Sequence, residues 1–256
     1  MSKKSARSSR LSTSKHYTAT SAVRIIGGRF KRRQLDFIDA EGLRPTPDRL
    51  RETLFSWLMA DLYSARVLDC CAGSGVLGFE ALSRGAAHCT FIEANPKQSQ
   101  LLSDSAELLQ VSQTDADILT GRAEVVIEQQ AGSFAPFDVV FIDPPYELDL
   151  WQPILKALLT NQLIHSETLL YLEADRPIND IVTVVEEEQE SESRQDAIQK
   201  VEKSTVQQAE DKPIATALAN DSVNTNTDSA EPSFYCLKET KVGQIHAGIY
   251  QYAVNS

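Results

Sequence analysis

The chain has 256 residues, of which 42% are hydrophobic, and a formal net charge of −11. This length is enough for one full α/β core with a tail or an insert to spare. No run of about 18 apolar residues occurs, and the first residues lack an apolar signal segment, so the sequence favours neither a membrane protein nor a secreted one. We therefore expect a cytoplasmic protein with no membrane partner, and a monomer.

Charge is distributed unevenly along the chain. Residues 1–33 hold ten Lys or Arg and no acid, whereas residues 186–232 hold twelve acids and four bases. Clustered cations suit contacts with nucleic-acid phosphates. The Ser-, Thr- and cation-rich residues 1–22 are predicted to be a disordered basic tail, and residues 186–232 a disordered acidic insert, because both have too few large apolar residues to fold alone.

Residues 23–45 follow the tail and predict a basic hairpin. Apolar Val23–Ile26 is followed by Gly27-Gly28 and then by a second alternating segment. Another candidate cation lies in the turn before Pro45. The candidate RNA-binding residues are Arg29, Lys31, Arg32, Arg33 and Arg44.

A helix is predicted over residues 47–62, because leucines and a tryptophan recur at helical spacing. Thr46 is its expected N-cap and Pro47 its expected first-turn proline. Arg49 and Arg51 are assigned to the solvated face, which is the usual place for helix charges.

Between residues 66 and 173, short apolar segments alternate with helical patterns, which predicts a doubly wound α/β sheet. The expected strands are 66–70, 88–93, 116–120, 137–142 and 167–173. The expected helices are 76–84, 96–110, 123–130 and 149–160. Alternation resumes in residues 234–239 and 244–250 around Gly243, which predicts a C-terminal hairpin. Residues 46–185 and 233–256 are therefore assigned to one domain.

A glycine-rich loop follows the first of these strands. Gly73, Gly75 and Gly78 allow a ligand to approach the backbone, and Glu93 at the end of the next strand can accept the hydroxyls of a ribose. The pattern also fits a dinucleotide oxidoreductase. Asp69 argues against that, because its carboxylate repels a pyrophosphate and attracts the ammonium of a methionine-like ligand. S-adenosylmethionine is the cofactor that matches these groups.

The sequence Asp143-Pro144-Pro145-Tyr146 follows a buried strand and predicts a mouth for a flat, amino-bearing ring. Two prolines offer only carbonyl acceptors, Asp143 adds a carboxylate, and Tyr146 provides an aromatic face for stacking. Hydride transfer gives such a mouth no role. The four cysteines show no C-x-x-C spacing and the four histidines are scattered, so no metal site is expected.

The motifs together resemble the RsmD family of bacterial 16S rRNA guanine-N2 methyltransferases. The matching segments are Arg24–Gly28, Leu43–Phe55, Asp69–Gly78, Asp143–Tyr146 and Lys241–Gln244. The resemblance implies a class I S-adenosylmethionine-dependent methyltransferase fold, Rossmann-like, with a seven-stranded, mostly parallel sheet and a C-terminal antiparallel hairpin. It also implies a guanine of 16S rRNA, in the small ribosomal subunit, as the acceptor.

Carried over by motif, Asp69, Gly73 and Gly75, with Ser74 between the glycines, surround the methionine part of the donor. Glu93 then holds the ribose and Ala123 the adenine, while the catalytic residues holding the guanine are Asp143, Pro144, Pro145 and Tyr146. The chain departs from the family pattern at Cys71, where an aromatic is common, at Arg122, where an acid is common, and in the acidic insert.

Two other functions stay open on the residues alone. The same mouth fits the N6 amine of adenine or the N4 amine of cytosine, in DNA or RNA. The fold also suits a nucleotide-binding or RNA-binding module without catalysis. The identity of the methylated nucleoside separates these three possibilities.

Overall fold

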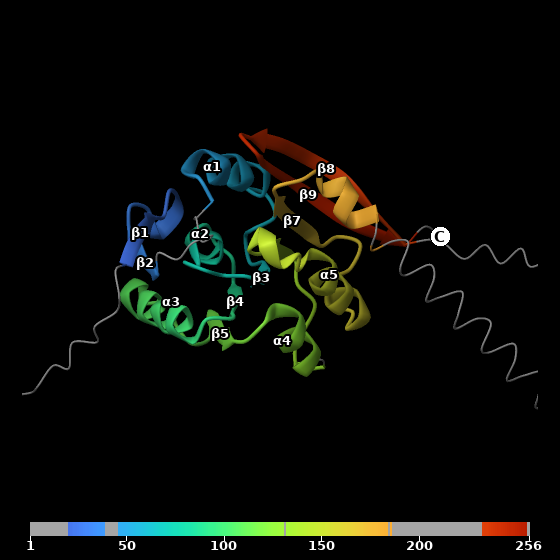
Figure 1. Cartoon of the computed structure of the whole chain (residues 1–256). Coiled ribbons are helices and arrows are strands. Elements are labelled where there is room, and N and C mark those ends of the chain that lie inside the picture. The colour runs from blue at the N-terminus through green and yellow to red at the C-terminus, as the bar shows by residue number, and fades with distance from the viewer. Residues whose placement is uncertain (1–19, 39–45, 131, 184, 186–231, 255–256) are drawn as a thin grey trace, which may run out of the picture.

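The computed structural model describes residues 20–38, 46–130, 132–183, 185 and 232–254. Its main sheet has seven strands in the order β5-β4-β3-β6-β7-β9-β8 (Figure 1). The parallel strands are β3 (Arg66–Asp69), β4 (His88–Glu93), β5 (Ala116–Thr120), β6 (Val139–Ile142) and β7 (Leu169–Ala174). They are followed by the antiparallel strands β9 (Ile245–Val254) and β8 (Pro232–Val242).

Helices cover both faces of this sheet (Figure 1). The first face carries α1 (Asp48–Trp57), α2 (Val76–Ser83) and α3 (Pro96–Leu109), and the second carries α4 (Ala123–Gln129) and α5 (Trp151–Thr160). Successive strand residues alternate between the two cores, since Val139 and Phe141 belong to the first and Val140 and Ile142 to the second. Because both faces are covered, β6 is apolar throughout, as is typical of parallel strands. The predicted doubly wound architecture is confirmed.

The predicted strands and helices of the central region all occur, with ends that differ by a few residues. The largest differences are late starts by two residues, at Val139 for β6, Trp151 for α5 and Leu169 for β7. One helical segment, residues 178–183, was not predicted. It packs Ile178, Ile181 and Val182 into the second core, a short apolar pattern that the following acidic stretch obscures in the sequence.

Helix α1 shows three errors in the sequence-based prediction, at its N-cap, at its end and at Arg51. It begins at Asp48 with Pro47 as its N-cap and without a side-chain cap, so Thr46 is not the capping residue, and it ends at Trp57 rather than residue 62. Arg49 is exposed as predicted, but Arg51 is fully buried. The Arg51 guanidinium donates to the Thr46 and Arg24 carbonyl oxygens, both at 3.0 Å, and to Asp48. It therefore joins three segments instead of facing solvent.

The predicted N-terminal hairpin is present as β1 (Thr20–Arg24) and β2 (Gln34–Ile38), with a short 3-10 helix η1 (Gly28–Phe30) between them. It docks against the end of α2, where Ser83 Oγ accepts the Phe30 N–H and donates to the Gly27 carbonyl. Gly28 has a φ of +69°, and a Cβ there would lie 1.9 Å from the Ser83 carbonyl oxygen. Glycine is required at this contact.

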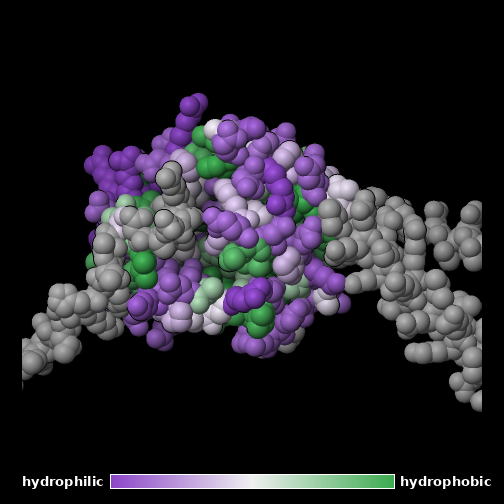
Figure 2. Space-filling model, viewed as in Figure 1, coloured by the Kyte–Doolittle hydropathy of each residue, from purple (hydrophilic) through white to green (hydrophobic). Residues whose placement is uncertain are grey.

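The predicted C-terminal hairpin is also confirmed, with Gly243 at a φ of 63° in the turn between β8 and β9. Residues 20–22, which were assigned to the predicted disordered tail, instead form the start of β1, and residues 1–19 lie outside the described residues. So do Arg44 and the predicted insert, except Pro232. On the face shown in Figure 2, hydrophilic residues gather at the upper left over the β1–β2 hairpin, while hydrophobic residues are grouped nearer the centre.

Candidate active site

A cavity of about 710 Å³ opens at the carboxyl ends of the parallel strands. The chain runs outward from β3 to β4 and β5 on one side, and continues with β6 and β7 on the other side of β3. The order of the strands therefore reverses between β3 and β6, which is where open α/β sheets bind their ligands. The loops after β3, β4, β5 and β6 all contribute to the wall.

The glycine loop forms one wall of the cavity. Asp69 ends β3, is almost fully buried, and accepts the Gly78 N–H of α2 at 3.1 Å through Oδ2. Burial, with a smaller contribution from the neighbouring Glu93, raises the pKa of Asp69 to about 7 against the lowering effect of that hydrogen bond. Gly73 and Ser74 line the cavity beside it. No Lys or Arg in the described part of the chain forms an ion pair with Asp69.

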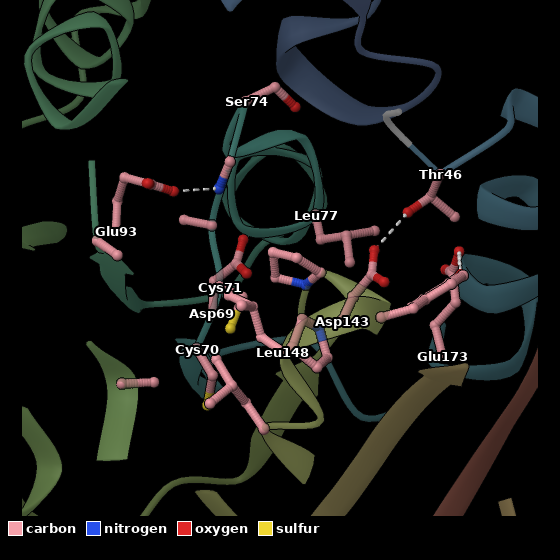
Figure 3. Close-up of a pocket in the computed structure, with 18 of the residues that line it drawn as sticks. Thr46, Asp69, Cys70, Cys71, Ser74, Leu77, Glu93, Asp143, Leu148 and Glu173 are labelled. Carbon is pink, nitrogen blue, oxygen red and sulfur yellow. Dashed lines mark hydrogen bonds between the residues drawn. The ribbon is translucent and has the colours of Figure 1, made fainter. Parts of the chain in front are cut away.

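Glu93 lies across this loop at the end of β4. Its Oε2 accepts the Gly73 N–H at 2.8 Å and its Oε1 accepts the Asn95 N–H at 2.7 Å, which fixes the carboxylate at the cavity wall (Figure 3). Burial raises the pKa of Glu93, although the backbone donors oppose the shift. Each oxygen retains a lone pair for a ligand hydroxyl.

Gly75 is the one predicted cofactor residue that does not line the cavity. It has a φ of 73° just before α2, and a Cβ there would lie 2.5 Å from Leu102 and 2.8 Å from Phe79. Gly75 therefore allows the loop to turn and the helix to pack against the core. The spacing of glycines in the sequence does not separate this role from ligand contact.

Ala123, the predicted adenine contact, begins α4 and lines the cavity. Arg122 precedes it and forms an ion pair with Glu124 at 2.6 Å. The other carboxylate oxygen of Glu124, Oε2, is buried and has no hydrogen-bond partner. An acid is therefore present near this position, but it is paired with the arginine and does not line the cavity.

The predicted catalytic segment, residues 143–146, lies entirely on the cavity wall. Thr46 Oγ1, just before α1, donates to Asp143 Oδ2 at 3.3 Å (Figure 3). Burial holds the pKa of Asp143 well above its ordinary value, and the nearby carboxylates of Glu173 and Asp69 raise it further. Asp143 is thus a strong acceptor with few donors around it.

Tyr146 is half-buried in the short 3-10 helix η2 (Tyr146–Leu148). Its ring is stacked on Trp151, with centroids 5.9 Å apart and an angle of 29° between the planes. Its hydroxyl donates to Glu173 Oε1 at 3.3 Å. The ring is held rigidly at the mouth by these two contacts, which is the arrangement a stacking platform needs.

Four of the five candidate RNA-binding cations are described, and they lie on the exposed hairpin outside the cavity wall. The exposed residues are Arg29, Lys31, Arg32 and Arg33. Arg33 donates to the Leu108 carbonyl oxygen at 2.9 Å, and the Arg29 guanidinium lies 4.5 Å from the centre of the Phe30 ring. The hairpin and the cavity share Phe37 of β2, which is part of the cavity wall.

The predicted site residues omit four polar residues that line the cavity, namely Thr46, Arg122, Glu147 and Glu173. Thr46 was assigned to a helix cap, and Glu173 looked like an ordinary residue at the end of a strand. Both come to the site only through tertiary packing. The larger apolar wall residues that were also missed are Phe37, Val76, Leu77, Leu148, Leu150 and Ile245.

Comparison with known proteins identifies the family. A family model described as conserved hypothetical protein 95 matches residues 23–202. A Haemophilus influenzae protein named Ribosomal RNA small subunit methyltransferase D is 38% identical over 158 residues, which cover 62% of this chain and 81% of the relative. The chain belongs to this RsmD family. The resemblance carried by the sequence motifs is thereby confirmed.

Solved structures agree with the fold. The Escherichia coli protein yhhF superposes with a TM-score of 0.63 at 28% identity, covering 92% of this chain and all of that one. The putative methyltransferase SMU.776, solved in complex with SAH, has a TM-score of 0.55 at 8% identity, covering 93% of this chain and 57% of that one, and shows the fold alone. The predicted class I methyltransferase fold is confirmed. Among the described residues, no helix is both long enough and apolar enough to cross a membrane.

Proposed function

We propose that this protein transfers a methyl group from S-adenosylmethionine to the N2 amine of a guanine in 16S rRNA, within the small ribosomal subunit. The observation that carries the proposal is the shared cavity. The glycine loop and the Asp143–Tyr146 segment face one space at the switch point of the sheet, in a chain of the RsmD family.

The residues of the first wall fit S-adenosylmethionine. Asp69 is a buried carboxylate without a cationic partner in the described residues, which suits the ammonium of the methionine part. Glu93 is fixed by two backbone N–H groups with lone pairs left for the ribose hydroxyls, and Ala123 leaves room for a flat ring. The donor supplies an electrophilic methyl group on a sulfonium.

The second wall fits an amine on a flat ring. The N2 lone pair of guanine is delocalised into the ring and is a poor nucleophile. In this proposal the Asp143 carboxylate and the Pro144 carbonyl accept hydrogen bonds from the two N2–H groups, which localises the lone pair on nitrogen. Tyr146 holds the ring in position, and positioning of this kind supplies much of the rate of a transfer reaction.

The hairpin supports an RNA substrate. Four exposed cations on a small, rigidly docked unit can bind phosphates while the cavity receives the base. We expect this to occur in the cytoplasm, where small subunits assemble. Arg44 is proposed to add a phosphate contact.

The test is to incubate the protein with methyl-labelled S-adenosylmethionine and either small subunits, free 16S rRNA or DNA, and to identify the labelled nucleoside. N2-methylguanosine in the rRNA is the expected product. Labelled N6-methyladenosine or N4-methylcytidine would replace the guanine assignment. Absence of label on all three substrates, with donor binding intact, would show a binding module instead.

A further inference from the structure

The cavity contains a second buried carboxylate that the transfer mechanism does not use. Glu173, at the end of β7, lies on the cavity wall near Asp143 and is only 3% exposed (Figure 3). Its Oε2 accepts the Tyr171 hydroxyl at 2.6 Å and its Oε1 accepts the Tyr146 hydroxyl at 3.3 Å. The Thr46 hydroxyl, which bonds to Asp143, also reaches Glu173.

The two carboxylates have more acceptor sites than the protein fills. Asp143 and Glu173 together offer four oxygens, each able to accept two hydrogen bonds. Among the described residues, three hydroxyl groups serve them, one each from Thr46, Tyr146 and Tyr171, and no Lys or Arg forms an ion pair with either. Unfilled acceptors in a buried site are costly unless a ligand brings donors.

Only one of the candidate bases brings two adjacent donors. The Watson–Crick edge of guanine presents N1–H beside the N2 amine. Adenine has an amine beside an unprotonated N1, and cytosine an amine beside an unprotonated N3. A pair of neighbouring acceptors is therefore matched by both donors of guanine, whereas adenine and cytosine each leave one acceptor without a donor.

We propose that Glu173 accepts a hydrogen bond from the N1–H of the target guanine while Asp143 accepts one from its N2 amine. The carboxylate pair then selects guanine over adenine and cytosine. Glu173 is thus a specificity-determining residue, held in place by Tyr171 on its own strand and by Tyr146 at the mouth. The inference rests on the proposed function, because it concerns recognition of the same guanine whose N2 amine is methylated.

The experiment compares two rRNA substrates, one with guanine and one with 2-aminopurine at the methylated position. Both carry the reactive 2-amine, but 2-aminopurine lacks the N1–H. Wild type should methylate the guanine RNA about 10- to 100-fold faster in single turnover, the scale of one hydrogen bond to a charged group. Glu173→Gln should lose about that factor on guanine and much less on 2-aminopurine.

Tyr171→Phe is the matched control, because it removes one donor to Glu173 but keeps the carboxylate, and it should retain the guanine preference. Equal losses on both RNAs in Glu173→Gln, with unchanged S-adenosylmethionine affinity and melting temperature, would overturn the inference in favour of a packing role. If Glu173→Gln does not fold, the wild-type protein still tests the inference, because equal wild-type rates on the guanine and 2-aminopurine RNAs would contradict the assignment. Failure of the proposed function would appear separately, as a wild-type product other than N2-methylguanosine.

Discussion

Buried acids occur in two regions of this molecule, and their surroundings differ. Beneath the N-terminal hairpin, fully buried Glu80 contacts Arg84 at 2.8 Å and Arg51 at 3.6 Å, and accepts the Ile26 N–H. In the cavity, Asp69 and Glu173 accept hydrogen bonds only from hydroxyl and N–H donors in the described residues. A buried charge is tolerated when it is paired. The first region is therefore structural, and the second is open to a ligand.

The cavity acids also have raised pKa values. Burial raises the pKa of four cavity acids, namely Asp69, Glu93, Asp143 and Glu173. Groups with perturbed pKa values in a cleft are typical of functional sites. Burial alone does not distinguish the acids of the two regions. The partner of each acid does, because Glu80 is paired with arginines and the cavity acids, within the described residues, are not.

The largest effect is expected for Asp69→Asn, as a change in how stability depends on pH. Asp69 is neutral in the folded protein below its pKa of about 7, whereas in the unfolded chain it ionises near pH 3.8. Its contribution to the free energy of unfolding is therefore fully present below about pH 4 and is lost as the pH rises through 7. The loss is on the order of 4 kcal/mol. In urea titrations the variant should be more stable than wild type at about pH 8 and not at about pH 4. Parallel stability curves for the two proteins would contradict this.

The next effect tests the paired region. Arg51→Met should destabilise the protein by about 3 kcal/mol, because it removes one cation from buried Glu80 and leaves the Thr46 and Arg24 carbonyls without their donor. Arg49→Met on the same helix is the control, since Arg49 is exposed and should change stability by less than about 0.5 kcal/mol. Similar urea midpoints for the two variants would show that Arg51 is not structural.

Whereas Arg51→Met should lower stability, Asp143→Ala should lower turnover and preserve the fold. Removing a positioned catalytic group should reduce kcat by about 100-fold, which corresponds to about 2.7 kcal/mol, with little change in S-adenosylmethionine affinity by calorimetry. Asp149→Asn, in the same loop but outside the cavity wall, is the control. Wild-type turnover in Asp143→Ala would refute the assignment of the mouth.

The fold and the local motifs were predictable from the sequence. The role of a residue was not predictable where it depends on a contact with a residue far away in the sequence. The strand ends at Asp69, Glu93 and Asp143 were predictable because apolar runs end there and polar residues follow. Arg51 was misassigned because a charge on a helix usually faces water, and nothing within α1 reveals that the hairpin covers it. Thr46 was misassigned because its sequence matches a capping pattern, whereas its hydroxyl is used across the cavity.

The smallest effect concerns the exposed cations of the hairpin. They belong neither to the buried ion pairs around Glu80 nor to the cavity wall, so they extend the comparison to a third region. Lys31→Ala on the hairpin should leave stability within about 0.5 kcal/mol of wild type and should not change S-adenosylmethionine affinity. If Lys31 contacts a phosphate, the slope of log affinity for the ribosomal substrate against log salt should fall by about 1. Lys238→Ala, exposed on the edge strand β8, is the control and should keep the wild-type slope. Equal slopes for both variants would mean that Lys31 only solvates the surface and makes no phosphate contact.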